Sequence, residues 1–363
     1  MRRGGGGVRD LEVVRGLLGA LRAGEPRTAG GLGLVPVFGG RAAAGYRLAE
    51  EAIAAGLLEV GELGGGVVPE LVVRNGAPEP VLLLEGEHLV GAKQDRVLNV
   101  SVLVPASSEL PIPVSCVEAG RWAYRSERRF GVERTFATPD VRRAKTRSVA
   151  ARQRRVGDRR SDQHAVWDAV AMRLAASGTG SPTASLRDAF VDRAKELDRI
   201  LEEAGEPLPE QTGVLACVGG RPVALDVLDR PETLARLWPR LIRAYALDAL
   251  GAQEAEVGEE EVERFVGRLR EAEVTAHDAV GLGTEVVLTA PGLAGSALVW
   301  EAAVVHLAAF ADPGNADAEA DPRSRTAAAI PLERGSEWRR RAGASADRSG
   351  SAPRSSGRGR SLR

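Results

Sequence analysis

Cysteine is scarce in this chain of 363 residues, which contains only Cys116 and Cys217. The two lie far apart in the sequence and lack metal-ligand spacing, so neither a disulfide framework nor a zinc site is indicated. Aromatic residues make up 4% of the chain, and alanine, valine and leucine must therefore form most of the core. The apolar run Val214–Val218 predicts that Cys217 belongs to that core.

Long hydrophobic runs are also lacking. No apolar segment approaches the roughly 20 residues that span a bilayer, and Met1-Arg2-Arg3 followed by glycines lacks the apolar part of a signal peptide. We therefore expect a cytoplasmic protein without membrane contact. Lys and Arg number 49 against 50 Asp and Glu, a formal net charge of -1. The protein has no overall charge that would attract nucleic acid. We therefore do not expect nucleic acid to be its partner.

The common catalytic motifs are missing from the sequence. It has no phosphate-binding loop, no Gly-x-Ser-x-Gly elbow and no dinucleotide fingerprint between a strand and a helix. The four histidines do not pair at the spacing of a helical metal site. His306, inside Val304–Leu307, is predicted to be a hydrogen-bonded core residue rather than a catalytic base.

Hydrophobic spacing predicts an α+β protein with a strand-rich N-terminal half packed against a helical C-terminal half. Short apolar runs bounded by turn residues predict the strands 32–38, 67–73, 81–84, 97–104, 112–117 and 285–289. Helical spacing predicts the helices 8–21, 46–55, two within 161–203, one from Pro231 and one over 254–279. The segment 297–310 fits a strand or a helix. Gly219-Gly220 between two apolar runs predicts a hairpin.

Composition divides the chain into three parts. Residues 1–29 are expected to form a peripheral N-terminal segment, and residues 30–312 a single α+β domain. From 313 to 363 the sequence turns to Ala, Asp, Ser, Arg and Gly, and little apolar area is left to offset the entropy of ordering it. This tail is expected to be disordered.

The densest polar stretch runs from Glu85 to Trp122 and is the expected functional surface. Side chains alternate along a strand, so Glu85 and Glu87 share one face, as do Cys116 and Glu118. If the two strands are neighbours, three carboxylates and a thiol converge, and these four residues are the candidate catalytic groups. Solvated strand ends, a structural ion pair and an inert buried thiol are the alternatives.

Six further residues of this stretch are candidates for ligand binding. Cations contact phosphate, carboxylates and amides hold hydroxyl groups or a divalent cation, and an aromatic ring stacks on a base. No cofactor can be named, although a divalent cation fits the carboxylates. The candidate ligand-binding residues are Lys93, Gln94, Arg96, Asn99, Arg121 and Trp122.

Between Arg142 and Arg160 the chain has nine basic residues and one acid, Asp158. Such a segment is typical of a solvated, partly helical charged face. The alternative is a strip that follows a phosphate backbone, whose binding would weaken steeply with salt.

Several strings in the sequence are long and unusual. They are Val68–Leu71, Leu84–Glu87, Gly91–Asn99, Pro113–Trp122 and Val305–Leu307. Over about residues 30–310 the chain resembles the ADP-ribosylglycohydrolase and rhodanese-phosphatase-superfamily-associated protein family. It departs from the family's pattern at Asp95, where an asparagine is expected more often. The basic segment and the arginine-rich tail lie outside the resemblance.

The resemblance implies a role beside pathways that process ADP-ribose and NAD-derived nucleotides, by analogy alone. The leading hypothesis is that the Glu85–Trp122 surface binds an ADP-ribose-like or other phosphorylated nucleotide, either by binding alone or with hydrolysis of the ligand or transfer from it. The second is a non-enzymatic module in which the same polar strip binds a protein partner of that pathway.

Overall fold

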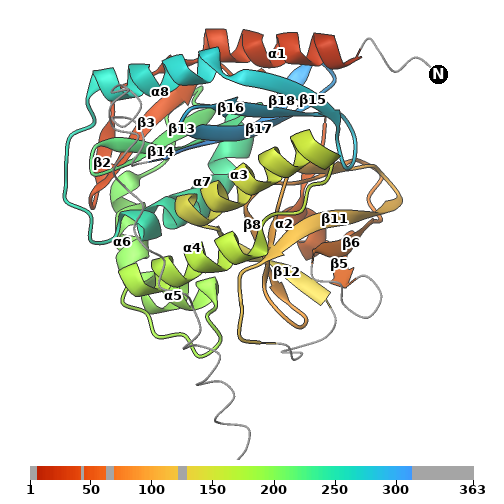
Figure 1. Cartoon of the computed structure of the whole chain (residues 1–363), viewed down its shortest axis with the longest axis horizontal. Helices are drawn as coiled ribbons and strands as arrows, with labels where there is room; N and C mark the ends of the chain where they lie inside the picture. The colour runs from red at the N-terminus through yellow and green to blue at the C-terminus, as the bar shows by residue number, and fades with distance from the viewer. Residues whose placement is uncertain (1–5, 42–44, 63–68, 122–128, 313–363) are drawn as a thin grey trace, which may run out of the picture. The chain divides into compact units, whose positions relative to one another are not determined.

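The computed structural model describes residues 6–41, 45–62, 69–121 and 129–312. Trp122 and the expected disordered tail lie outside these residues. The α+β class is confirmed, but the expected division into a strand half and a helix half is only partly correct, because strands return after the helices. The described chain forms a nine-stranded sheet, a closed barrel and a three-stranded sheet, with helices packed around them (Figure 1).

The nine-stranded sheet is antiparallel throughout, in the order β1-β3-β13-β14-β18-β17-β16-β15, with β2 also beside β3. The predicted Gly219-Gly220 hairpin is confirmed: both glycines have positive φ, as the tight turn between β13 and β14 requires. The sheet begins before Gly30, the expected start of the domain. Its strands are β1 (Arg22–Ala23), β2 (Arg27–Ala29), β3 (Leu32–Phe38), β13 (Gly213–Val218), β14 (Arg221–Leu228), β15 (Glu273–Asp278), β16 (Thr284–Ala290), β17 (Leu293–Trp300) and β18 (Ala303–Ala311).

Two helices cover one face of this sheet, α1 (Gly6–Ala20) and α8 (Glu259–Glu271) (Figure 1). The apolar stripe predicted for the N-terminal helix is present, and its residues Val14 and Leu18 are buried. They form one core with sheet residues and with Phe265 of α8. Cys217 belongs to this core, as predicted.

The other face of the sheet carries the remaining long helices (Figure 1). Helix α7 begins with Pro231 in its first turn, where the missing N–H costs nothing. Its buried Trp238 and Tyr245 anchor the largest core of the described protein. The helices on this side are α3 (Pro139–Val156), α4 (Gln163–Ala176), α5 (Leu186–Asp192), α6 (Ala194–Ala204) and α7 (Pro231–Ala249).

The barrel closes in the order β11-β6-β5-β12-β8-β9 and has its own apolar core, to which Leu71, Leu98, Ile112 and Phe130 contribute. Beside it lie the small sheet β10-β7-β4 and helix α2 (Ala49–Ala54). The barrel strands are β5 (Leu58–Glu62), β6 (Glu70–Asn75), β8 (Glu87–Gly91), β9 (Arg96–Leu98), β11 (Ser108–Cys116) and β12 (Arg129–Phe136), and the small sheet consists of β4 (Arg47–Leu48), β7 (Val81–Leu83) and β10 (Val102–Val104).

Three element predictions are corrected by the structure. The strand expected over 97–104 is two strands, β9 and β10, which belong to different sheets. The helix expected over 254–279 ends at Glu271, and Glu273–Asp278 forms the edge strand β15, because pairing with β16 overrides helix propensity. The segment 297–310 is two strands, β17 and β18. The turn between them is formed by Glu301 and Ala302, which have positive φ although neither is a glycine. The sequence therefore contains no glycine that would have predicted a turn there.

A buried network of ion pairs joins the barrel side to the large sheet. Arg142 of α3 donates to Glu85, in the turn between β7 and β8, at 2.7 Å, and to Asp226 of β14 at 2.7 Å and 2.9 Å. Lys145 also binds Glu85. His306 Nε2 lies 3.0 Å from Asp226, and its Nδ1 lies 2.8 Å from Ser101 Oγ. The prediction of a hydrogen-bonded core histidine is therefore confirmed.

Replacing Asp226 by Asn is expected to lower the free energy of unfolding by about 3–5 kcal/mol at pH 7, because it leaves buried cations without their partner. Urea unfolding measures this. Arg74→Gln, which breaks the exposed pair with Glu109, is the control and should cost no more than about 1 kcal/mol. Equal effects of the two changes would contradict the role assigned to the network.

Stability should also fall in acid. Burial alone would raise the pKa values of Glu85 and Asp226, but Arg142 lowers both below their ordinary values. A depressed folded-state pKa stabilises the protein above the unfolded pKa of about 4, and this stabilisation is lost as pH falls below it. Asp226→Asn should therefore show a shallower loss of stability below about pH 4 than the parent protein, measured by thermal melting across pH.

Candidate functional site

The polar segments Ala92–Asp95 and Val117–Arg121 meet at one end of the barrel. They meet because β9 pairs with both β8 and β11, which brings the turn after β8 beside the end of β11. The backbone N–H of Val117 donates to Asp95 O at 3.1 Å. We call the polar side chains gathered here the barrel-end cluster: His88, Gln94, Asp95, Arg96, Cys116, Glu118 and Arg121.

Glu118 is the centre of the barrel-end cluster. Its carboxylate accepts from Arg121 Nε at 2.8 Å and Nη2 at 2.6 Å, from Thr183 Oγ1 at 2.9 Å and from the Asp95 N–H at 3.1 Å. Burial works to raise the pKa of Glu118, but the hydrogen bonds from Arg121, Asp95 and Thr183 lower it below its ordinary value. Glu118 is therefore ionised at neutral pH and anchors the bidentate arginine.

Arg121 also ties the two segments together. Its Nη1 donates to Ala92 O at 2.8 Å, and Nη2 lies 3.3 Å from Asp95 Oδ1. Ser185 Oγ approaches the other oxygen of Asp95 at 3.5 Å. The carboxylate at position 95, where an asparagine was expected more often, thus faces a guanidinium.

Arg96 differs from its neighbours because no acid in the described structure forms an ion pair with it. The side chain is 3% exposed. Its Nη1 donates to neutral oxygens, Gln94 Oε1 at 3.1 Å and Asp95 O at 3.4 Å, and its Nε–H has no partner among the described residues. Burial lowers the pKa of Arg96. A buried guanidinium in this state has unused capacity to bind an anion.

Cys116 lies opposite Arg96 in the ladder between β11 and β9. Its thiol donates to the Glu118 carbonyl at 3.2 Å. Burial raises the pKa of the Cys116 thiol, although Arg96 opposes the rise. The thiol is therefore protonated at neutral pH, and an activated nucleophile needs the opposite shift.

His88 was not among the candidate site residues. It is fully buried on β8, and neither ring nitrogen has a hydrogen-bond partner in the described structure. Burial lowers the pKa of His88 below its ordinary value, although the negative charges of Asp95 and Glu133 act to raise it. The imidazole is therefore neutral. Thr183 and Ser185 were missed as well. Both lie far along the chain in the loop before α5, and only the fold brings them to Glu118.

The condition for convergence, that the strands of Glu87 and Cys116 are neighbours, is not met, because β9 lies between β8 and β11. Glu87 binds Arg240 of α7 at 2.8 Å and the Leu84 N–H at 3.1 Å. Glu85 belongs to the network with Arg142, whereas Glu118 binds Arg121. The carboxylates therefore have separate partners. Within the described residues no group of three or more acids, histidines or cysteines is arranged to hold a metal ion.

Most of the candidate residues are buried rather than exposed at a surface. Glu85, Glu87, Cys116 and Glu118 are at most 1% exposed, because helices α3, α4 and α7 and the loop before α5 cover this side. Among the candidate ligand-binding residues, Gln94, Arg96 and Asn99 are buried, whereas Lys93 and Arg121 are partly exposed. Asn99 binds Ser115 Oγ at 2.6 Å and Arg159 O at 3.0 Å. Trp122 lies outside the described residues.

The basic segment 142–160 is largely neutralised by acids. Arg142 and Lys145 are buried in the ion-pair network rather than solvated. Other members form ion pairs on the surface or near it. These pairs are Arg143–Asp312, Arg147–Asp312, Arg152–Asp158, Arg154–Glu273, Arg159–Glu285 and Arg160–Asp158.

Both thiols should be unreactive in the folded protein. Burial raises the pKa of Cys116, and it raises the pKa of Cys217 to about 12. At pH 7.5 iodoacetamide is expected to label neither residue faster than the protein unfolds, and to label both in guanidinium chloride, as intact-mass spectrometry would measure. Rapid labelling of Cys116 alone in the native protein would restore it as a candidate nucleophile.

Comparison with protein families places most of the chain in a described domain. Residues 20–310 match the ARPP-1 domain, described as the ARG and Rhodanese-Phosphatase-superfamily-associated Protein domain. No curated protein and no solved structure matches the chain. In the described part of the chain, no helix is both long and apolar enough to cross a membrane. Because the match spans most of its length, including the barrel-end cluster, the chain belongs to the ARG and Rhodanese-Phosphatase-superfamily-associated Protein domain family.

Proposed function

We propose that this chain binds a phosphorylated, nucleotide-like ligand at the barrel-end cluster and serves a pathway that processes ADP-ribose or NAD-derived nucleotides. The pathway rests on the family description, with ARG taken as ADP-ribosylglycohydrolase. The ligand class rests on one observation, the buried guanidinium of Arg96 with its unpaired Nε–H. No reaction is assigned to the chain.

The argument from Arg96 is energetic. Removing a charge from water without pairing it costs several kcal/mol, so a buried cation is expected to have an anionic partner. A phosphate offers oxygens at the spacing of a guanidinium's two donors. Lys93 and Arg121 are partly exposed on the same two segments, and the ligand would approach from their side. In this proposal both would contact phosphate, and Glu118 would hold Arg121 in position.

The other candidate residues take different parts in the proposal. Gln94 orients Arg96 through its side-chain oxygen. Glu85, Glu87 and Asn99 stabilise the joint between barrel and sheet rather than touch the ligand, and the protonated Cys116 packs beside Arg96. A divalent cation would be bound by the phosphate of the ligand rather than by the protein, because the carboxylates here form ion pairs with arginines and lysine.

Calorimetric titration tests the proposal. Purified protein is titrated with ADP-ribose, NAD and ADP, with and without magnesium, and saturable binding of ADP-ribose is expected. Arg96→Gln should weaken it by about tenfold to a hundredfold, because a hydrogen bond to a charged group contributes about 1.5–3 kcal/mol. Arg74→Gln is the matched control on β6 of the same barrel and should leave affinity unchanged.

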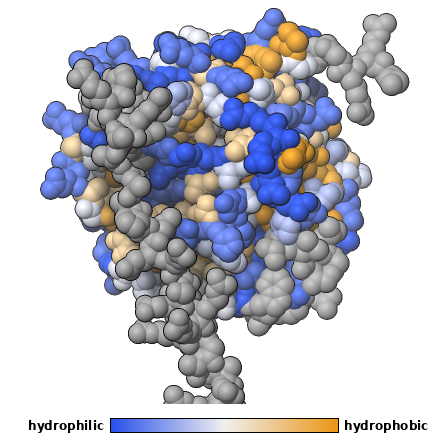
Figure 2. Space-filling view, viewed as in Figure 1, coloured by the Kyte–Doolittle hydropathy of each residue, from blue (hydrophilic) through white to orange (hydrophobic). Residues whose placement is uncertain are grey.

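The outcomes are distinguishable. Arg96→Gln removes a buried unpaired charge, so its melting temperature should equal or exceed that of the parent, and lost binding would then not reflect unfolding. Absence of heat with every nucleotide would sink the proposal and favour the protein-interaction module. The face shown in Figure 2 is mostly hydrophilic, with small separate hydrophobic areas, so a protein partner bound there would make mostly polar contacts.

A further inference from the structure

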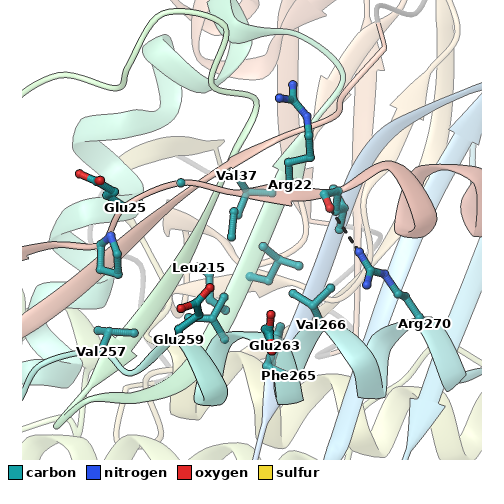
Figure 3. Close-up of a pocket in the computed structure, with 16 residues that line it drawn as sticks. Arg22, Glu25, Val37, Leu215, Val257, Glu259, Glu263, Phe265, Val266 and Arg270 are labelled. Carbon is teal, nitrogen blue, oxygen red and sulfur yellow. Dashed lines mark hydrogen bonds between the residues drawn. The ribbon is translucent and has the colours of Figure 1, made fainter.

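A cavity lies on the opposite side of the large sheet from α3 and α7. It has a volume of about 770 Å³ and is enclosed by α8, by β1 with the residues after it, and by the sheet itself (Figure 3). Its floor is apolar, formed by the buried Val37, Leu215, Leu225 and Phe265. A cavity of this size is within the range of small-molecule sites, and its floor suits a hydrocarbon body.

Two carboxylates stand at the mouth of this cavity. Glu259 and Glu263 are one turn apart on α8 and exposed, and in Figure 3 both point from the helix toward the β1 side of the cavity. Neither side-chain carboxylate forms an ion pair or a hydrogen bond with any described residue. Like charges at this spacing repel each other and destabilise a helix. The negative charge of Glu259 interacts favourably with the helix dipole at the N-terminus of α8. Glu263 lies beyond the first turn and does not gain this stabilisation.

The two arginines of the rim do not neutralise these acids. Arg270 donates from Nε to Leu18 O at 3.1 Å and from Nη2 to Leu21 O at 3.4 Å, where it caps the end of α1. Arg22 stacks near Phe38, 5.8 Å from the ring centre, and points away from Glu259 and Glu263 in Figure 3. The cavity therefore combines an apolar floor with uncompensated negative charge at its mouth.

We propose that this cavity binds a small organic cation with an apolar body, namely a protonated amine. The hydrocarbon part would lie on Leu215, Leu225 and Phe265, and the ammonium group would lie between the carboxylates of Glu259 and Glu263. Such a ligand removes apolar area from water and relieves the repulsion between the two acids. The site is separate from the barrel-end cluster and does not depend on the function proposed for it.

A pair of matched probes tests this proposal. Full-length protein is titrated with 4-phenylbutylamine and with 4-phenylbutyrate, which share an apolar body and differ in charge, and binding is followed by ligand-observed NMR. The amine should bind saturably and at least about fivefold more tightly than the acid. The double variant Glu259→Gln/Glu263→Gln should weaken amine binding by about fivefold or more and remove the preference over the acid.

Two further variants make the result specific. Glu254→Gln/Glu260→Gln changes the charge equally at exposed acids that do not line the cavity, and it should alter amine affinity by less than about twofold. Val266→Trp fills the cavity from α8 and should abolish binding of both probes, with the melting temperature as a check on folding. Equal binding of amine and acid to the parent, equal effects of the two double variants, or no saturable binding would each overturn the proposal.

Discussion

The buried guanidinium of Arg142 is the contact on which the arrangement of barrel and sheet depends. It lies between the carboxylates of Glu85 and Asp226 and over the ring of Phe310, 4.7 Å from its centre. Burying these charges separately would cost several kcal/mol each, so they are stable only together. The turn before β8, helix α3 and strand β14 must therefore meet in one arrangement, and packing alone would tolerate more than one.

Gly86 shows how closely that contact is fitted. Its φ is +83°, and a Cβ atom at this position would lie 2.5 Å from Arg142 Nε. Only glycine allows the backbone to turn there and the guanidinium to reach Glu85. Because β8 follows directly, the same turn sets where β8 and β9 begin and end. The position of the barrel-end cluster thus depends on the ion-pair network, although the two share no side chain.

Local patterns predicted much of the fold. The N-terminal helix, the strand 32–38 and the Gly219-Gly220 hairpin follow from periodicity and turn chemistry within a few residues. Strand β15 and the Glu301-Ala302 turn were missed because pairing partners decide them. Sequence reasoning also took Arg142 and Lys145 for members of a solvated basic run. Their carboxylate Glu85 is 57 and 60 residues away, and local charge counting cannot detect such a partner.

The same limit applies to the candidate site. The motifs around Gly91–Asn99 and Pro113–Arg121 predicted two polar segments that the fold brings together, but not which polar atoms remain unsatisfied. Asp95, Glu118 and Arg121 bind one another, whereas Arg96 and His88 retain donors or acceptors without a described partner. Unsatisfied capacity of this kind, rather than polarity itself, separates a binding group from a structural one. Which groups keep such capacity is known only when the positions of all neighbouring residues in the fold are known.

Strand β8 contributes both to the ion pairs with α7 and to the barrel-end cluster. Successive side chains of a strand point to opposite faces, so Glu87 reaches Arg240 on α7 while His88 faces Asp95, Glu118 and Glu133. A slip of one residue would exchange the two and bury a carboxylate where a neutral imidazole now lies. The ion pair with Arg240 opposes that slip. Opposite β8, the ladder with β12 shifts register between Val132 and Phe136, which leaves His88 facing a bulge. The pairing of Glu87 thus fixes the register that places His88 in the barrel-end cluster.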